Sequence, residues 1–108
     1  MDSFEEEKKK IEQFVFERDW DQFHSPANLA KSISIESGEL LECFQWDEKH
    51  YDKQAIQEEL ADVMIYCFQM GIAMDFDLKK IIEEKMAKNA IKYPVSKAKG
   101  NARKYNKL

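Results

Sequence analysis

Residues 54–73 read QAIQEELADVMIYCFQMGIA and form a long helical pattern. Apolar residues recur in this stretch at intervals of three and four, the spacing of one face of an α-helix. They are Ile56, Leu60, Val63, Met64, Cys67 and Met70. The stretch therefore predicts a helix from about Gln54 to Ala73. Two acids, Glu59 and Asp62, lie on or beside this inward face, where apolar residues are expected.

Three further stretches carry helical patterns, at about residues 4–21, 26–46 and 78–91. Ser25 is suited to cap the second helix, with Pro26 at its first position, and Asp77 to cap the last one. The sequence has only three glycines and two prolines, too few turn residues for a sheet of many strands. We therefore predict an all-α fold of four helices, with a loop at 47–53 and an irregular tail after Pro94.

The length of 108 residues is that of one domain. We assign residues 1–94 to a single helical catalytic domain and residues 95–108 to a basic C-terminal tail. A helical chain this short buries a modest core, and we expect it to cover its apolar stripes in a homodimer or a dimer of dimers, a homotetramer.

Charge is unevenly distributed along the chain. All 21 acids lie in the first 84 residues, whereas residues 85–108 hold eight basic residues and no acid. This asymmetry fits a cation site and an anion site in one molecule, although composition alone favours a solvated tail. An acidic body argues against general binding to nucleic acid.

Several observations indicate a cytoplasmic protein. No run of about 18 apolar residues is present to span a membrane, and the charged start does not resemble a signal peptide. Cys43 and Cys67 stand singly in helical patterns, which indicates two buried thiols in a reducing compartment.

Four carboxylates decide the functional interpretation. Glu36 and Glu39 are three residues apart on the second predicted helix, and Glu59 and Asp62 repeat this spacing on the third. Helical geometry turns Glu36 and Glu59 toward the apolar face, with their companions beside them. Buried like charges are costly unless a cation neutralises them. Glu42, three residues further, fits either a neighbour of this cluster or a surface acid.

Oxygen donors without cysteine or histidine favour Mg²⁺, with Mn²⁺ or Ca²⁺ as alternatives, over zinc. A di-iron bundle would need histidine three residues after a glutamate, and Glu39 and Asp62 occupy those positions. A non-enzymatic helical interaction protein with surface acids or a structural cation remains the alternative.

Other side chains are candidates for holding a ligand, although each also fits a structural role. Trp20 and Trp46 stand at element ends, where an indole can stack on a nucleobase. His24 lies in the connection before the second helix, and Tyr66 follows Asp62 by one turn. Lys85, Asn89 and Lys92 share one side of the last helix and offer a row of phosphate contacts, or a solvated face.

These segments resemble the MazG-like all-α nucleoside triphosphate pyrophosphohydrolases, in particular their dCTP-pyrophosphatase-like branch. The similarity extends over roughly residues 10–105. The matching segments are 18–24 with 28–30, the acidic segment 36–42 with 44–46, the acidic segment 58–63 with 65–66, and 85–89 with 93–94.

The resemblance implies hydrolysis between the α- and β-phosphates, giving a nucleoside monophosphate and pyrophosphate, for control or cleaning of the nucleotide pool. Glu36, Glu39, Glu59 and Asp62 would hold Mg²⁺, with Glu39 favoured to activate water. Substrate contacts would come from Trp20, His24, Asn28, Trp46, Tyr66, Lys85, Asn89 and Lys92. Ile35 stands where many members have a second glutamate, which leaves the number of metal ions open, and Ile11 replaces a polar base-contacting residue of some relatives.

Overall fold

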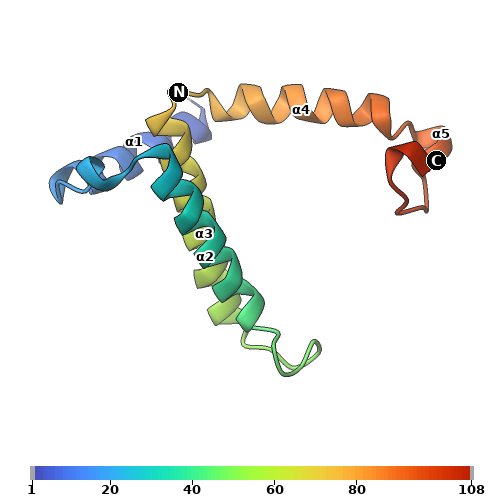
Figure 1. Cartoon of the computed structure of the whole chain (residues 1–108), viewed down its shortest axis with the longest axis horizontal. Coiled ribbons are helices and arrows are strands. Elements are labelled where there is room, and N and C mark those ends of the chain that lie inside the picture. The colour runs from blue at the N-terminus through green and yellow to red at the C-terminus, as the bar shows by residue number, and fades with distance from the viewer. Residues whose placement is uncertain (1, 108) are drawn as a thin grey trace. The chain divides into compact units, whose positions relative to one another are not determined.

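A computed structural model describes residues 2–107, and every regular element among them is helical (Figure 1). The elements are α1 (Ser3–Glu17), η1 (Asp21–Phe23), α2 (Pro26–Glu42), α3 (Lys53–Ala73), α4 (Leu78–Lys92), α5 (Val95–Ala98) and η2 (Tyr105–Lys107). The predicted all-α class is confirmed, and so are the four main helices. The tail is not wholly irregular as predicted, because it contains α5 and η2.

The chain divides into two compact units, one ending at Phe76 and the other beginning at Asp77. In the first unit, α2 and α3 make the most extensive contact and lie side by side, and α1 packs on α3. Phe4 of α1 stacks on Phe68 of α3 with ring centroids 5.9 Å apart. The division after Phe76 reflects which residues pack together. The predicted boundary after residue 94 instead marks where the sequence becomes basic.

Helix α1 ends at Glu17, four residues before the predicted end at Asp21, because the backbone reverses at Asp19. Asp19 has a left-handed φ of 54°, and the N–H of Trp20 donates to the carbonyl of Val15 at 3.1 Å. This pattern is a Schellman C-cap, which satisfies carbonyls that the helix leaves free. Asp75 repeats it after α3, with a φ of 55° and Phe76 N–H donating to Gly71 O at 2.8 Å.

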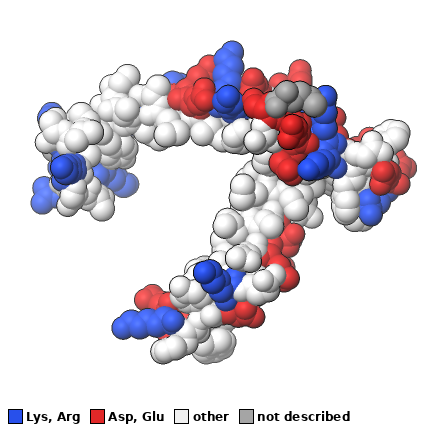
Figure 2. Space-filling model, turned by 180° about the vertical axis from the view of Figure 1, so that it is seen from behind, with Lys and Arg blue, Asp and Glu red and all other residues white. Residues whose placement is uncertain are grey.

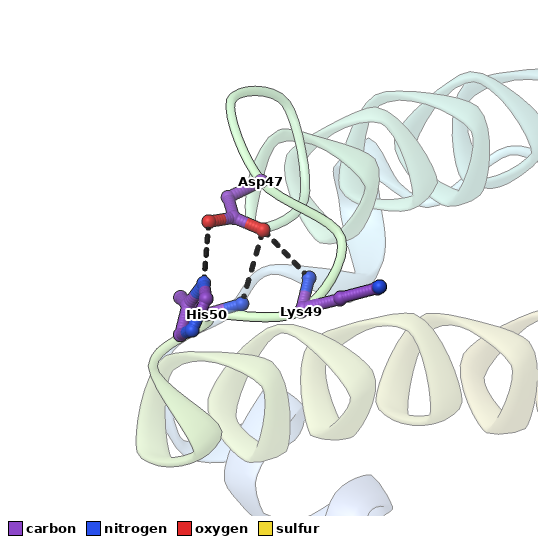
Figure 3. A network of polar contacts seen from close by, with 3 residues as sticks. All are labelled: Asp47, Lys49 and His50. Atoms are coloured by element: carbon purple, nitrogen blue, oxygen red, sulfur yellow. Dashed lines mark hydrogen bonds and ion pairs between the residues drawn. The ribbon is translucent and has the colours of Figure 1, made fainter.

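The loop between α2 and α3 is held by one carboxylate, as Figure 3 shows. Asp47 Oδ1 accepts the backbone N–H groups of Lys49 at 2.8 Å and His50 at 3.2 Å. Its Oδ2 lies 2.6 Å from His50 Nδ1. Helix α2 ends at Glu42 and not at Trp46 as predicted, so Trp46 belongs to this loop.

Few apolar side chains are covered within the chain. Among residues 2–107, Val15 and Leu29 are the buried hydrophobic side chains, at 7% and 1% exposure. Both cysteines are free, Cys43 half-buried and Cys67 exposed, so the predicted burial of Cys67 is wrong. No helix in the described part of the chain has the length and apolar character needed to cross a membrane.

Candidate metal centre

Side-chain caps define where the two site helices begin. Ser25 Oγ accepts the N–H of Asn28 at 3.1 Å, as predicted from the Ser25-Pro26 pair, and starts α2. Asp52 accepts the N–H of Gln54 at 3.0 Å and of Ala55 at 3.3 Å, and starts α3. Because the helices pack along their lengths, acids from the middle of α2 meet acids from the first half of α3.

Three carboxylates form the core of the site. Glu36, Glu59 and Asp62 each offer a carboxylate oxygen, and these oxygens all lie within 4.8 Å of one another. One oxygen of Glu36 and one of Glu59, in both cases Oε2, are buried and accept no hydrogen bond from the described residues. Buried acceptors without partners are uncommon in folded proteins, and a bound cation is one of the ordinary explanations.

The electrostatics of the cluster point the same way. Burial, followed by a hydrogen bond with Glu39 and the charges of Glu39, Asp62 and Glu59, raises the pKa of Glu36 to about 7. Burial and the charge of Glu39 are also the main causes that raise the pKa of Glu59. Like charges at this distance resist joint ionisation unless a cation stands between them.

Glu39 lies beside this cluster but outside its tightest group. It is exposed, and it interacts with both Glu36 and Glu59. The three oxygens within 4.8 Å come from the other acids. Its position fits a group that holds a water next to a metal ion as well as a fourth ligand.

The donor set fits a hard divalent cation. The three clustered groups are all carboxylates, the ligands that Mg²⁺ and Mn²⁺ accept, and none is a sulfur or an imidazole. Mg²⁺ usually takes one or two carboxylates from the protein and completes its shell with water and substrate phosphates. Glu36, Glu59 and Asp62 would therefore hold the ion and leave positions for a phosphate.

The two predicted base-stacking tryptophans have different surroundings. Trp20 is 45% exposed and packs edge-on against Phe14 with centroids 5.8 Å apart, while the guanidinium of Arg18 lies 3.7 Å above the Phe14 ring. Trp46 is 89% exposed in the loop after α2. An indole so exposed gains little from its own chain, so Trp46 is free to meet a ligand or a second protein chain.

The remaining predicted contacts separate into two groups. His24 is half-buried, and Asn28 donates from Nδ2 to the carbonyl of Phe23 at 3.1 Å, which fixes the turn before α2. Tyr66 is half-buried on α3, one turn after Asp62. Lys85, Asn89 and Lys92 are exposed on α4, in the second compact unit. Their roles in substrate binding stay predictions.

Gln69 was not anticipated from the sequence. It is 8% exposed on α3, and its Oε1 has no hydrogen-bond partner within the described chain. The available signal is a single amide inside the otherwise apolar run 67–72.

Comparison with known proteins identifies the family of the chain. Residues 31–108 match the MazG-like family, and the chain belongs to that family. It is 39% identical to rat dCTP pyrophosphatase 1 and 38% identical to the human protein of that name, in both cases over 105 residues. Each alignment covers 89% of this chain, which spans 62% of the length of each relative.

A solved structure supports the fold. The crystal structure of a pyrophosphatase from Archaeoglobus fulgidus superposes with a TM-score of 0.76 at 34% sequence identity. The match covers 87% of this chain and 94% of the archaeal one.

Proposed function

We propose that this chain hydrolyses nucleoside triphosphates, including deoxynucleoside triphosphates, to the monophosphate and pyrophosphate with the help of Mg²⁺. The observation that carries the proposal is the convergence of Glu36, Glu59 and Asp62 within 4.8 Å, with two buried oxygens left unpaired. The names of the relatives, dCTP pyrophosphatase and pyrophosphatase, indicate the bond that is cleaved and favour dCTP-like substrates.

In this reaction a water oxygen attacks a phosphorus of the α–β bridge, and the bond from that phosphorus to the bridging oxygen breaks. A bound Mg²⁺ supplies charge neutralisation to the phosphate oxygens. Glu39 is the exposed carboxylate beside the cluster, and we assign to it the role of orienting the water and accepting its proton. The products are a nucleoside monophosphate and pyrophosphate, one of which carries the water oxygen and the other the former bridging oxygen.

Substitution of single carboxylates tests this assignment. Glu39→Gln and Asp62→Asn should stay helical by circular dichroism yet lose nearly all Mg²⁺-dependent release of pyrophosphate from a panel of nucleoside triphosphates. Glu42→Gln is the matched control, because Glu42 is an exposed acid one turn beyond Glu39 on the same helix. Full activity in both site variants would overturn the proposal. Absence of hydrolysis by the wild type, with a thermal shift on adding Mg²⁺, would favour a structural cation site.

We also propose that the active form is a homodimer or homotetramer in the cytoplasm. Large apolar side chains such as Phe16, Leu41 and Ile91 are 73%, 70% and 81% exposed, and uncharged surface covers much of the face in Figure 2. Gly38 lies inside α2, where glycine is less favourable for the helix than alanine, and a Cβ at this position would meet no other atom of the chain. A glycine at such a position fits the close approach of another chain. A monomer in analytical ultracentrifugation at micromolar concentration would contradict this assembly.

A further inference from the structure

One side of helix α3 is left open by the helices that pack on it. Leu60 and Met64 are 46% and 53% exposed, and Cys67 is exposed as well. They follow one another at intervals of four and three residues, so they form one row along the helix, which we call the α3 stripe. Alternating intervals of four and three residues are the pattern of a seam between two packed helices.

The α3 stripe faces away from the metal centre. Met64 follows Asp62 by two residues, which is about 200° around an α-helix. Helices α1 and α2, which also pack on α3, occupy other sides of it. A second chain on the stripe therefore leaves Asp62 and the carboxylates beside it accessible.

Opposite charges stand beyond the two ends of the stripe. Lys53 is the first residue of α3, Asp75 lies two residues after the last one, and both are exposed. Neither forms an ion pair with another described residue. Lys53 precedes Met64 by eleven residues, and Asp75 follows it by eleven. The two charges are therefore balanced about Met64.

A second copy of this chain fits that arrangement. A contact between identical copies related by a two-fold axis requires a patch that complements itself. Two antiparallel α3 helices that cross at Met64 bring Lys53 of each copy to the end where Asp75 of the other lies, and they place Leu60 near the smaller Cys67. A parallel pair would instead bring Lys53 to Lys53 and Asp75 to Asp75.

We propose that the α3 stripe is the surface on which a second copy of this chain docks, with the two α3 helices antiparallel about an axis at Met64. The inference rests on the assembly proposed above, and it names the face, the direction and the residues of the contact. It does not depend on the proposed hydrolysis.

Sedimentation velocity of the full chain, from nanomolar to micromolar concentration, tests the charges at the ends. Lys53→Glu should weaken association about tenfold, because two repulsive pairs replace two ion pairs. Glutamate is favourable at the start of a helix, so this change preserves α3. Adding Asp75→Asn should restore most of the affinity, and asparagine tolerates the left-handed φ at this position. Lys49→Glu, the same change at an exposed position before α3, is the matched control and should leave association unchanged.

Two further measurements test the stripe itself. Met64→Asp buries two carboxylates at the axis and should weaken association at least about 100-fold. In Cys43→Ser the remaining thiol is that of Cys67. Its reaction with a thiol reagent should slow as the protein concentration rises through the range of association.

The outcomes separate the contact face from the assembly. Association unaffected by Lys53→Glu, or a loss that Asp75→Asn does not relieve, would overturn the antiparallel contact even if Met64→Asp does not fold. A reaction rate of Cys67 that is independent of concentration would overturn it too. In these cases the wild type still associates, so the proposed assembly stands with another face as its contact. A wild type that stays monomeric would overturn both.

Discussion

Neutralising one half-buried acid should stabilise this protein when metal is absent and destabilise it, relative to the wild type, when metal is present. Glu36 is the residue of choice, because its pKa is raised to about 7 mainly by burial and by contact with Glu39. Glu36→Gln keeps the shape of the side chain and removes the charge. The neutral amide is not repelled by the three neighbouring carboxylates, which stabilises the metal-free protein. A bound cation, in contrast, loses one of its ligands.

The expected size follows from the two pKa values. The folded value of about 7 exceeds the ordinary value of 4.5, so the proton is held more tightly in the folded state. Stability from this group is therefore complete below pH 4.5 and is lost as pH rises through 7. At 1.36 kcal/mol per pH unit the difference is about 3.4 kcal/mol, and partial exposure to solvent reduces it to about 1–2 kcal/mol. Glu36→Gln should recover that amount at pH 8, or about 4–16 °C in Tm.

Thermal unfolding followed by circular dichroism measures the change in Tm both without and with metal. In EDTA at pH 8, Glu36→Gln should melt above the wild type, and the two should converge at pH 4.5. Addition of millimolar Mg²⁺ should raise the Tm of the wild type and leave that of the variant nearly unchanged. Glu42→Gln, which removes an exposed acid from the same helix, should respond to Mg²⁺ like the wild type. A variant less stable than the wild type in EDTA, or equal Mg²⁺ responses, would refute the reasoning.

Three further substitutions test local features of the fold. Asp52→Ala removes the acceptor at the start of α3 and should lower the free energy of unfolding in urea by about 1 kcal/mol, whereas Asp52→Asn should retain most of it; equal losses would deny the cap. Asp75→Gly relieves a left-handed φ of 55° and should raise the free energy of unfolding by up to about 1 kcal/mol, and a decrease would contradict that strain. The pKa of Asp47 is lowered by the backbone N–H of Lys49 and by His50. Its contribution is present above pH 3.8 and lost as pH falls through the lowered pKa. Asp47→Ala should therefore lower Tm more at pH 6 than at pH 2.5, and a Tm difference independent of pH would exclude an ionic role.

Local chemistry explains which helix boundaries could be predicted. The start of α2 depends on Ser25 and Pro26, and the start of α4 on Asp77, so both follow from neighbouring residues. The end of α1 depends on a left-handed conformation at Asp19. A glycine at this position would have predicted that conformation, whereas an aspartate does not. Helix α2 ends before the apolar pattern does, since Phe44 contacts Tyr51 across the loop, with centroids 5.2 Å apart.

The site divides in a similar way. Spacing along two helices predicts that Glu36, Glu59 and Asp62 face the same space, because packed neighbouring helices carry inward residues into contact. Spacing does not predict that Glu39 lies outside the tightest group, since that depends on the register between the helices. Spacing gives no sign of the buried, unpaired Oε1 of Gln69, because this residue lines a cavity to which α1, η1 and α3 all contribute.

The scarcity of buried apolar side chains has a consequence for how the protein exists in a cell. With Val15 and Leu29 as the covered hydrophobic side chains among the described residues, the separate chain has little to hold it folded. In the proposed assembly each copy acts as a stabilising ligand for the other, and such stabilisation grows with concentration. Dilution would then favour unfolding, because it separates the copies. A higher rate of synthesis would raise the concentration and so increase the folded fraction that resists degradation.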